Sequence, residues 1–398
     1  MNIRGVLEKM IAARGSDLHL KAGTPPVVRV DGVLYTLDEP PPTSAELKEV
    51  ANQLLNEDQR AFFASHNEID FAFGVSGLAR FRANVFMQRG TPALALRHVP
   101  VEVPTFEDLG LPPVVRDLAF SPRGLILVTG RTGSGKSTSL AAMIDTINRT
   151  TTRNVITVED PIEFLHRDRL SFIHQREVGL DTLSFHEGLR YVLRQDPDII
   201  LIGEIRNLET MSTALMAADT GHLVMSTLHT TDVVQSIQRI ISFYPPHQHD
   251  EIRQSLSSNL RAVISQRLIP RRDGAGRVPS CEVMVSTPTI REYILNPDKL
   301  PLIHSVVAEG VTQYGMQTFD QSVLALLRDG VITEEEALKN CNNPNELSLK
   351  LKGISSTSDR QWQSVDAAST GGPVPGSPGA AAAAAGQPGA RPDWMSRE

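Results

Sequence analysis

The chain has 398 residues, more than one domain usually contains, so we expect two folded domains with terminal extensions. Apolar residues make up 40% of the sequence and charged residues 21%, a balance that is ordinary for soluble globular proteins and excludes a fibrous or wholly disordered chain. The formal charge of -7 at pH 7 gives no electrostatic footprint for binding nucleic acid along a whole face. Nucleic acid is therefore not an expected partner, and only a local basic patch would be compatible with one.

The two cysteines, Cys281 and Cys341, lie far apart, which excludes both a disulfide framework and a four-cysteine zinc site within one chain. Residues 1–14 have helical spacing of apolar side chains but lack the continuous apolar core of a signal peptide. No apolar run approaches the roughly 20 residues that span a bilayer. We therefore expect a cytoplasmic protein whose association with a membrane is peripheral.

Residues 1–100 show short, β-rich patterns. Asp31 and Gly32 form a turn dipeptide that tolerates positive φ angles, and the apolar segments on either side predict a β-hairpin over residues 27–37. A helix is expected over residues 44–64, where Leu47 and Val50 fall on one face, and further strands are expected over residues 69–73, 79–88 and 93–99. Together these elements predict a small α+β domain.

Residues 101–123 contain several prolines and few periodic signals, so we expect an interdomain linker with one short helix. In residues 124–285, apolar strands alternate with helical segments, which is typical of an α/β fold with a mainly parallel sheet covered by helices. The expected strands are residues 125–129, 155–159, 199–203 and 223–227.

The C-terminal part of the sequence divides in two. Residues 286–353 read as several helices, one of them opened by Thr333 with Glu336 as a capping box. Residues 354–398 are rich in Ser, Thr, Gly and Pro and then in Ala, and cannot bury enough apolar surface to stay ordered. We expect a helical end-piece followed by a disordered tail.

Residues 130–137, Gly-Arg-Thr-Gly-Ser-Gly-Lys-Ser, match the P-loop pattern between an apolar strand and an amphipathic helix. In this arrangement glycines let backbone N–H groups curl around phosphate oxygens, the lysine reaches the β and γ phosphates, and the serine hydroxyl binds Mg²⁺. The alternative, a merely glycine-rich turn, is disfavoured because eight positions match in the right context. We expect ATP and Mg²⁺ as ligands, and the predicted nucleotide-binding residues are Gly130, Thr132, Gly133, Ser134, Gly135, Lys136, Ser137 and Thr138.

Two further strands end in carboxylates. Asp198 begins one of them and is expected to cap its start, whereas Glu204 ends it, where a P-loop enzyme holds its metal or orients the attacking water. The other strand is followed by three carboxylates within residues 156–163, and Glu163 is the favoured candidate for a general base. The alternatives are a structural carboxylate at Glu204 and a solvated acidic loop around Glu163.

Residues 221–230 form another such strand, with a histidine near each end. His229 could stabilise phosphate charge, whereas His222 begins the strand, away from the expected active edge. In the N-terminal region Arg82 alternates with apolar neighbours, and Arg97 lies on the next strand. These arginines form either a solvated face or a source of positive charge for the γ-phosphate of another subunit.

Over about residues 1–345 these motifs together resemble the secretion ATPase superfamily, and within it the PilT-like retraction motors of type IV pili. Residues 130–137 correspond to the family's Walker A motif, residues 156–163 to its Asp box, residues 198–206 to its Walker B motif and residues 221–229 to its His box. All four occur in the family's order.

The resemblance implies a PAS-like N-terminal domain, a RecA-like ATPase domain and a ring of six subunits. It further implies that Glu163 activates water, that Glu204 lies on the Mg²⁺ side, that His229 lies near the γ-phosphate, and that Arg82 and Arg97 act on a neighbour's nucleotide. The implied partner is the inner-membrane pilus platform protein, reached from the cytoplasmic face of that membrane, and related pilus ATPases could join the ring.

Pilus-assembly and type II secretion relatives carry a longer N-terminal region and usually a four-cysteine metal motif, so the sequence favours retraction over assembly. The segment that retraction motors share near their C-terminus is altered here over residues 289–296, where only Ile290, Arg291 and Ile294 match. The leading hypothesis is therefore an ATP-hydrolysing hexamer that retracts type IV pili. The alternatives are an accessory paralogue, an assembly or type II secretion ATPase and, as the least favoured, a DNA-handling motor, for which the composition shows no basic channel.

Overall fold

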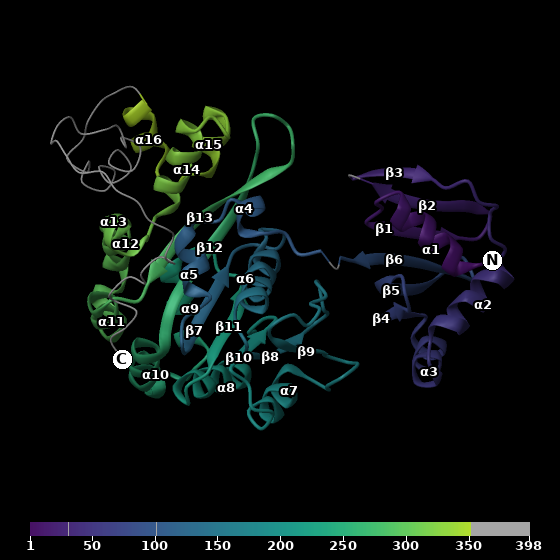
Figure 1. Ribbon diagram of the computed structural model, residues 1–398, viewed down its shortest axis with the longest axis horizontal. Coiled ribbons are helices and arrows are strands. Elements are labelled where there is room, and N and C mark those ends of the chain that lie inside the picture. Colours follow the sequence, from purple (N-terminus) through teal and green to yellow (C-terminus); the bar gives the residue numbers. More distant parts are fainter. Residues whose placement is uncertain (31, 101, 352–398) are drawn as a thin grey trace, which may run out of the picture. The chain divides into compact units, whose positions relative to one another are not determined.

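The computed structural model describes residues 1–30, 32–100 and 102–351. The predicted disordered tail, residues 354–398, lies outside these described residues. The chain forms two compact units (Figure 1). The first comprises Met1–Val103 with Pro161–His166, and the second comprises Pro104–Asp160 with the described residues from Arg167 onward.

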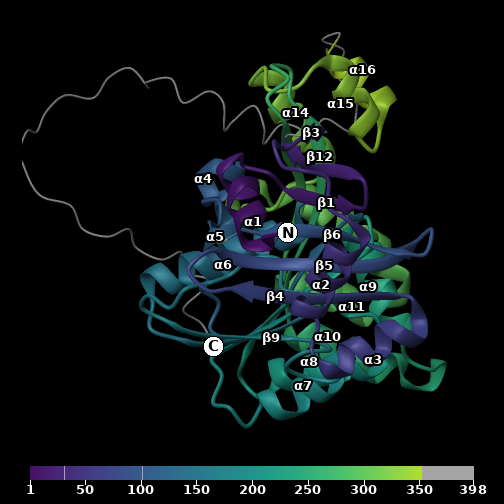
Figure 2. The ribbon, with the colours of Figure 1, turned by 90° about the vertical axis from the view of Figure 1, so that its right-hand side faces the viewer.

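The first unit is built on a six-stranded antiparallel sheet in the order β3-β2-β1-β6-β5-β4, which faces the viewer in Figure 2. Its strands are β1 (Asp17–Lys21), β2 (Thr24–Val30), β3 (Val33–Thr36), β4 (Glu68–Val75), β5 (Ala79–Gln88) and β6 (Thr91–Val99). The predicted hairpin is confirmed, because Val30 pairs with Val33 and Gly32 takes a φ of 84°. Strand β1 was not predicted.

The helices of this unit are α1 (Ile3–Ala12), α2 (Ser44–Leu54) and α3 (Glu57–His66). The prediction of one helix over residues 44–64 is wrong, because the chain breaks after α2. Asn56 and Gln59 form a reciprocal capping box there, and their side chains satisfy backbone N–H groups at the start of α3. The core joins buried side chains of α1 and α2 to the inward face of the sheet, including Leu7, Met10, Leu47, Leu18, Phe81 and Leu96.

The second unit contains a seven-stranded sheet in the order β13-β12-β7-β11-β10-β8-β9. All neighbours are parallel except β12 and β13, which confirms the predicted α/β fold with a mainly parallel sheet. The strands are β7 (Gly124–Thr129), β8 (Asn154–Glu159), β9 (Phe172–Glu177), β10 (Ile199–Ile202), β11 (Leu223–Leu228), β12 (Leu260–Pro270) and β13 (Arg277–Val285).

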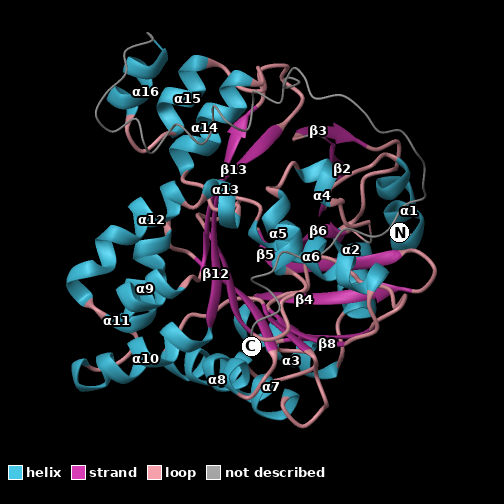
Figure 3. Cartoon of the chain, turned by 60° about the vertical axis from the view of Figure 1, so that its left-hand side comes forward, coloured by secondary structure: helices cyan, strands magenta, loops and turns pink. Residues whose placement is uncertain are grey.

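Helices cover both faces of this sheet, as Figure 3 shows with helices in cyan and strands in magenta. One face carries α4 (Phe106–Leu109), α5 (Pro113–Leu118) and α6 (Lys136–Thr150). The other carries α7 (Phe185–Val192), α8 (Leu208–Asp219), α9 (Val233–Ser242) and α10 (His249–Asn259), the last preceded by the 3-10 turn η1 (Pro246–Gln248). Every residue of β7, β10 and β11 is buried, which explains why apolar residues dominate these strands.

Two features differ from the predicted division of the chain. Helices α4 and α5 lie within the predicted linker, residues 101–123, and pack against α6 and β12, so most of that segment belongs to the second unit. The segment Pro161–His166, within the predicted ATPase core, belongs instead to the first unit, where Leu165 N donates to Pro100 O at 3.2 Å. A switch of this kind between two units leaves no periodic signal in the sequence.

The predicted helical end-piece is present. It comprises α11 (Pro288–Leu295), the 3-10 segment η2 (Pro297–Leu302), α12 (Ile303–Glu309), α13 (Val311–Tyr314), α14 (Phe319–Arg328), α15 (Glu334–Asn340) and α16 (Pro344–Leu351). Ile269 and Val278, near the β12–β13 turn, share a small core with α14 and α15. Among the helices of residues 1–30, 32–100 and 102–351, none combines the length and the apolar composition of a membrane span.

Replacing Phe81 by alanine should destabilise the first unit by about 3–5 kcal/mol, because the ring is fully buried at the centre of that unit's core. The matched control is Phe62→Ala on α3, whose ring is 48% exposed and whose loss should cost less than about 1 kcal/mol. Urea unfolding followed by circular dichroism measures both. Equal losses would contradict this assignment of the core.

Candidate nucleotide-binding and hydrolytic site

The register of the parallel strands brings four chain segments to one edge of the sheet. Thr129 at the end of β7 pairs with Leu228 at the end of β11, and Ile202 at the end of β10 pairs with Ser226 and Val158. The residues that follow these strand ends therefore lie along a common edge, where open α/β sheets bind their ligands. The edge carries the P-loop, the Walker B carboxylate and His229.

The P-loop turns sharply because three of its glycines have positive φ. The φ angles of Gly130, Gly133 and Gly135 are 144°, 78° and 90°. At Gly130 a Cβ would lie only 2.5 Å from the carbonyl oxygen of Gln266 and from Ser134 Oγ. The loop thus packs directly against the backbone of β12, and only glycine fits at that point.

The predicted phosphate ligands gather on this loop. Lys136 is only 8% exposed, and its Nζ donates to the carbonyl oxygens of Gly130 and Arg131 at 2.9 and 3.1 Å. Ser134 Oγ is buried without a hydrogen-bond partner among the described residues. Helix α6 begins at Lys136 without a side-chain cap, which leaves its dipole and first N–H groups to an anion. These features fit a bound polyphosphate.

The remaining P-loop residues of the prediction lie on the same turn. Thr132 is exposed on the loop, whereas Ser137 and Thr138 are half-buried in the first turn of α6. Ser137 directly follows Lys136, the predicted phosphate ligand, so its hydroxyl is placed in sequence where a P-loop enzyme supplies a Mg²⁺ ligand.

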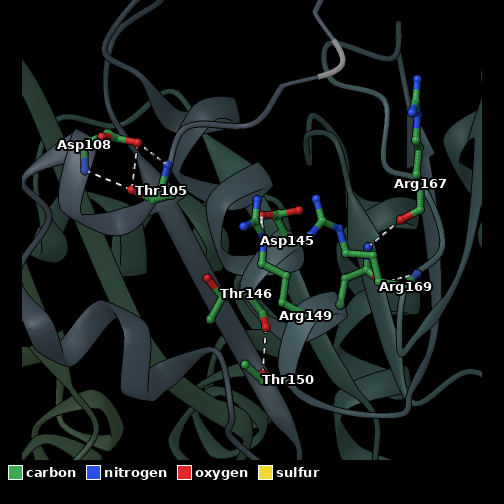
Figure 4. A network of polar contacts seen from close by, with 9 residues as sticks. Thr105, Asp108, Asp145, Thr146, Arg149, Thr150, Arg167 and Arg169 are labelled. Carbon is green, nitrogen blue, oxygen red and sulfur yellow. Dashed lines mark hydrogen bonds and ion pairs between the residues drawn. The ribbon is translucent and has the colours of Figure 1, made fainter.

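Helix α6 is anchored at its far end. The side chain of Asn148 donates through Nδ2 to Arg167 O at 2.7 Å and accepts from Arg169 N at 3.0 Å, contacts whose arginine partners are labelled in Figure 4. On the same helix, Arg149 pairs with the buried Asp145 four residues earlier (Figure 4). Asn148 thereby ties the loop before β9 to the helix that starts at the P-loop.

Glu204 is the centre of a small polar group beyond β10. Its side chain is 12% exposed, and its carboxylate contacts Arg206 Nη2 through one oxygen and His229 Nε2, at 3.3 Å, through the other. The backbone there is fixed by its neighbours, since Gly203 N donates to Val158 O at 2.8 Å and Ile205 N donates to Thr227 O at 3.2 Å. The structure therefore brings together Glu204 and His229, which the sequence places 25 residues apart.

The two residues assigned to the opposite edge have structural partners. Asp198 accepts from Asn154 N at 2.8 Å and pairs with Arg153 at 3.0 Å. His222 Nδ1 lies 2.9 Å from Ala217 O at the end of α8. Both groups hold the starts of strands.

The carboxylates at the end of β8 and in the loop after it divide between the two units. Glu159 belongs to the second unit, and its Oε1 accepts from Thr157 Oγ1 at 2.7 Å and from Gln175 Nε2 at 3.1 Å, which turns it toward β9. Glu163 is exposed and belongs to the first unit. Its assignment to water activation stays a prediction.

Arg82 and Arg97 are paired across β5 and β6 on the polar face of the first unit's sheet. Arg97 Nε donates to Asp17 Oδ1 at 2.7 Å, and its side chain remains 62% exposed. Burial by itself would raise the pKa of Asp17, but hydrogen bonds from Ser16 and Arg97 outweigh it and hold that pKa below its usual value. The predicted arginine pair is thus a surface feature held in place by a carboxylate.

The sequence did not predict the buried side-chain hydrogen bonds that join α6 and β7 to β12 next to the P-loop. Ser139 on α6 and Gln266 on β12 exchange side-chain hydrogen bonds of 2.8 and 3.2 Å, and Thr129 Oγ1 lies 2.8 Å from Ser265 Oγ. All four side chains are buried. Strand β12 was not predicted, and its pairing with β7 joins positions more than 130 residues apart.

Replacing Gly130 by alanine should weaken nucleotide binding at least about tenfold, or about 1.4 kcal/mol, because its Cβ would push the loop off β12. Gly133→Ala is the matched control, since it also has positive φ but its Cβ would meet nothing within 4 Å. Titration with a fluorescent ATP analogue measures both affinities. Equal weakening would show that backbone strain alone, and not the contact with β12, shapes the loop.

The chain is similar to a defined group of proteins. Residues 4–326 match the family model described as type II/IV secretion system protein. The chain is 44% identical over 344 residues to the type IV pilus retraction ATPase PilT of Pseudomonas aeruginosa, covering 86% of this chain and 99% of that protein. It is 40% identical over 361 residues to the type IV pilus ATPase PilU of the same organism, covering 90% and 93% of the two chains.

A solved structure agrees with these similarities. The crystal structure of the pilus retraction motor PilT with bound ADP matches with a TM-score of 0.81 and 44% identity, and covers 87% of this chain and 99% of that one. The chain therefore belongs to the family of type II/IV secretion system proteins, and within that family it is PilT-like.

Proposed function

We propose that this chain is a Mg²⁺-dependent ATPase that assembles as a homohexamer and powers the retraction of type IV pili. The observation that carries the proposal is the shared sheet edge, where the P-loop, Glu204 and His229 follow neighbouring parallel strands. The similarity to PilT over most of both chains supports retraction in particular.

In this proposal, some residues of the second unit bind the nucleotide and others take part in its hydrolysis. The P-loop amides and Lys136 bind the β and γ phosphates, and the α6 N-terminus adds a favourable dipole. Mg²⁺, held by Ser137 and Glu204, would neutralise charge on the phosphates. His229, beside Glu204, is close to where γ-phosphate charge develops, and its imidazole stabilises that charge.

The residues of the first unit complete the site. Glu163 acts as the base that orients the attacking water, and Arg82 and Arg97 supply positive charge to the γ-phosphate bound by a neighbouring subunit. The two arginines share one sheet face, so a rigid sheet can present both at once. A ring of six subunits provides each nucleotide with such a neighbour.

Hydrolysis would drive changes in the arrangement of the two units, and this movement would be passed to the pilus platform protein at the cytoplasmic face of the inner membrane. The association with the membrane is peripheral in this proposal.

The second candidate is an accessory paralogue that joins a related pilus ATPase. The observation in its favour is the 40% identity to PilU, which extends over 90% of this chain. Such a subunit would bind ATP and assemble but depend on its partner for movement of the pilus.

Replacing Glu204 by alanine should lower kcat about 10²–10³-fold with ADP affinity nearly unchanged, because the P-loop that binds phosphate is left intact. Arg82→Ala should lower kcat at least about 10²-fold. Arg89→Ala, on the exposed turn after β5, is the matched control and should keep wild-type turnover. Phosphate release with and without Mg²⁺, together with particle mass, measures chemistry and assembly in the same samples.

Co-expression tests whether the arginine acts between subunits. Rings of Arg82→Ala and Glu204→Ala subunits should regain about a quarter of wild-type turnover, since half the sites keep Glu204 and half of these face an intact Arg82. No recovery in mixed rings would place the arginine in the same subunit.

Two observations distinguish the motor from the accessory paralogue. A stable wild-type ring without ATP turnover would favour the paralogue. Cells lacking the protein should lose pilus retraction only under the leading proposal.

A further inference from the structure

A buried carboxylate outside the nucleotide motifs contacts the helix that follows His229. Glu282 lies on β13 and is 2% exposed, and its Oε2 accepts a hydrogen bond from Val233 N at 2.9 Å. Val233 is the first residue of α9, so the hydrogen bond joins the start of that helix to a strand 49 positions away. Helix α9 lies beside β12 and β13 (Figure 3).

The contact meets a specific need of α9. The first N–H groups of a helix have no partner within it, and a buried one must find an acceptor elsewhere. Asp232 caps the helix by accepting from Gln235 N at 2.8 Å, and Glu282 accepts from Val233 N. A negative charge at this end is also favoured by the helix dipole. Two carboxylates therefore share the capping of one helix.

Short hydrogen bonds connect this cap to Thr230, the residue that follows His229. Thr230 Oγ1 lies 2.6 Å from Ser236 Oγ, and Ser236 Oγ donates to Asp232 O at 2.6 Å. On its other side, His229 directly follows the buried strand β11. The loop carrying His229 is thus fixed by the sheet at one end and by the Glu282 contact at the other, while the imidazole itself is 54% exposed and reaches Glu204.

Strands β12 and β13, which position Glu282, are themselves fixed by hydrogen bonds at two places. Glu282 pairs with Ser265 on β12, whose hydroxyl meets Thr129 at the base of the P-loop. Arg267, two residues along β12, donates to Asn340 O at 2.7 Å and to Asn342 Oδ1 at 2.8 Å. The contact therefore rests on a strand pair held both at the P-loop and at the end of α15.

Burying a carboxyl group at this position costs folding stability, because burial disfavours its charged form. Burial raises the pKa of Glu282 to about 7, with Asp232 and Asp320 adding to the rise, while the Val233 N–H and Arg267 oppose it. Groups whose pKa is strongly raised by burial cluster at functional sites, which makes Glu282 a candidate for a functional role beside the geometry of its contact with α9.

We propose that Glu282 is a positioning residue for ATP hydrolysis: by accepting the Val233 N–H it fixes the start of α9, and with it the loop that holds His229 beside Glu204. This inference rests on the proposed ATPase function. It assigns no contact with nucleotide to Glu282 itself.

The test compares Glu282→Ala with Glu282→Gln in the full-length chain. The alanine variant loses the acceptor, so kcat should fall about tenfold or more, because small misplacements at a reacting centre are costly. ADP affinity should stay unchanged, since the P-loop is untouched. Hydrogen exchange should rise over residues 229–236 and not over residues 130–145. The glutamine variant keeps a carbonyl oxygen for the Val233 N–H and should retain most of the turnover.

Val233→Pro removes the donor instead of the acceptor. Proline is tolerated at the first position of a helix, so this variant should fold and reproduce the loss seen in Glu282→Ala. Ser280→Ala is the matched control on the same strand, because its buried hydroxyl has no hydrogen-bond partner among the described residues, and it should behave as wild type.

The outcomes separate cleanly. The proposal would be overturned if Glu282→Ala and Val233→Pro left both kcat and hydrogen exchange over residues 229–236 unchanged. A rise in exchange over the whole second unit would also overturn it. So would a fall in kcat in Glu282→Gln as large as the fall in Glu282→Ala. If the wild-type chain hydrolyses no ATP, the proposed function fails, while the local exchange still decides whether Glu282 fixes the loop.

Discussion

The in-register pairing of β7, β11, β10 and β8 is the constraint on which the rest of the second unit depends. These central strands are buried on both faces, so they have no room for solvated catalytic groups along their length. Polar chemistry must begin where the strands end. Because the strands are parallel and nearly level, their ends meet, and Glu204 and His229 become neighbours.

Close packing against β12 then shapes the P-loop. Gly130 lies so near the carbonyl oxygen of Gln266 that a side chain cannot be accommodated, and the Ser139–Gln266 hydrogen bonds hold α6 to the same strand. The helix dipole is thereby aimed at a fixed point at the sheet edge. The shape of the P-loop therefore depends on the neighbouring strand β12 as well as on the loop's own glycines.

In the first unit, charged residues are placed by alternation along the strands and not by the strand ends. Its antiparallel strands alternate buried and half-buried residues, so Phe81 enters the core while Arg82 lies on the polar face. Pairing of β5 with β6 places Arg97 opposite Arg82, and Asp17 on β1 holds Arg97 from the other side. Positive charge is thus concentrated on one face of this sheet, where the Arg97 side chain is 62% exposed and Arg82 is half-buried.

The sequence by itself determined the local elements. Glycine spacing and strand-turn-helix order identified the P-loop, alternation placed Arg82 opposite Phe81, and apolar runs located the central strands, because each of these signals depends on residues close together in the chain. It also ranked His229 above His222 by position along one strand. The family resemblance rested on these same motifs.

Only the tertiary structure decided which distant groups meet. The pairing of β12 with β7, the pairing of Glu282 with the start of α9, and the membership of Glu163 in the first unit all join segments without any shared periodic pattern. The break between α2 and α3 is different, because its signal is local: residues 56–60 carry no apolar side chain, and Asn56 with Gln59 three positions on forms the capping box that starts α3. Contacts across long stretches of sequence are set by packing and strand register, which composition and spacing do not encode locally.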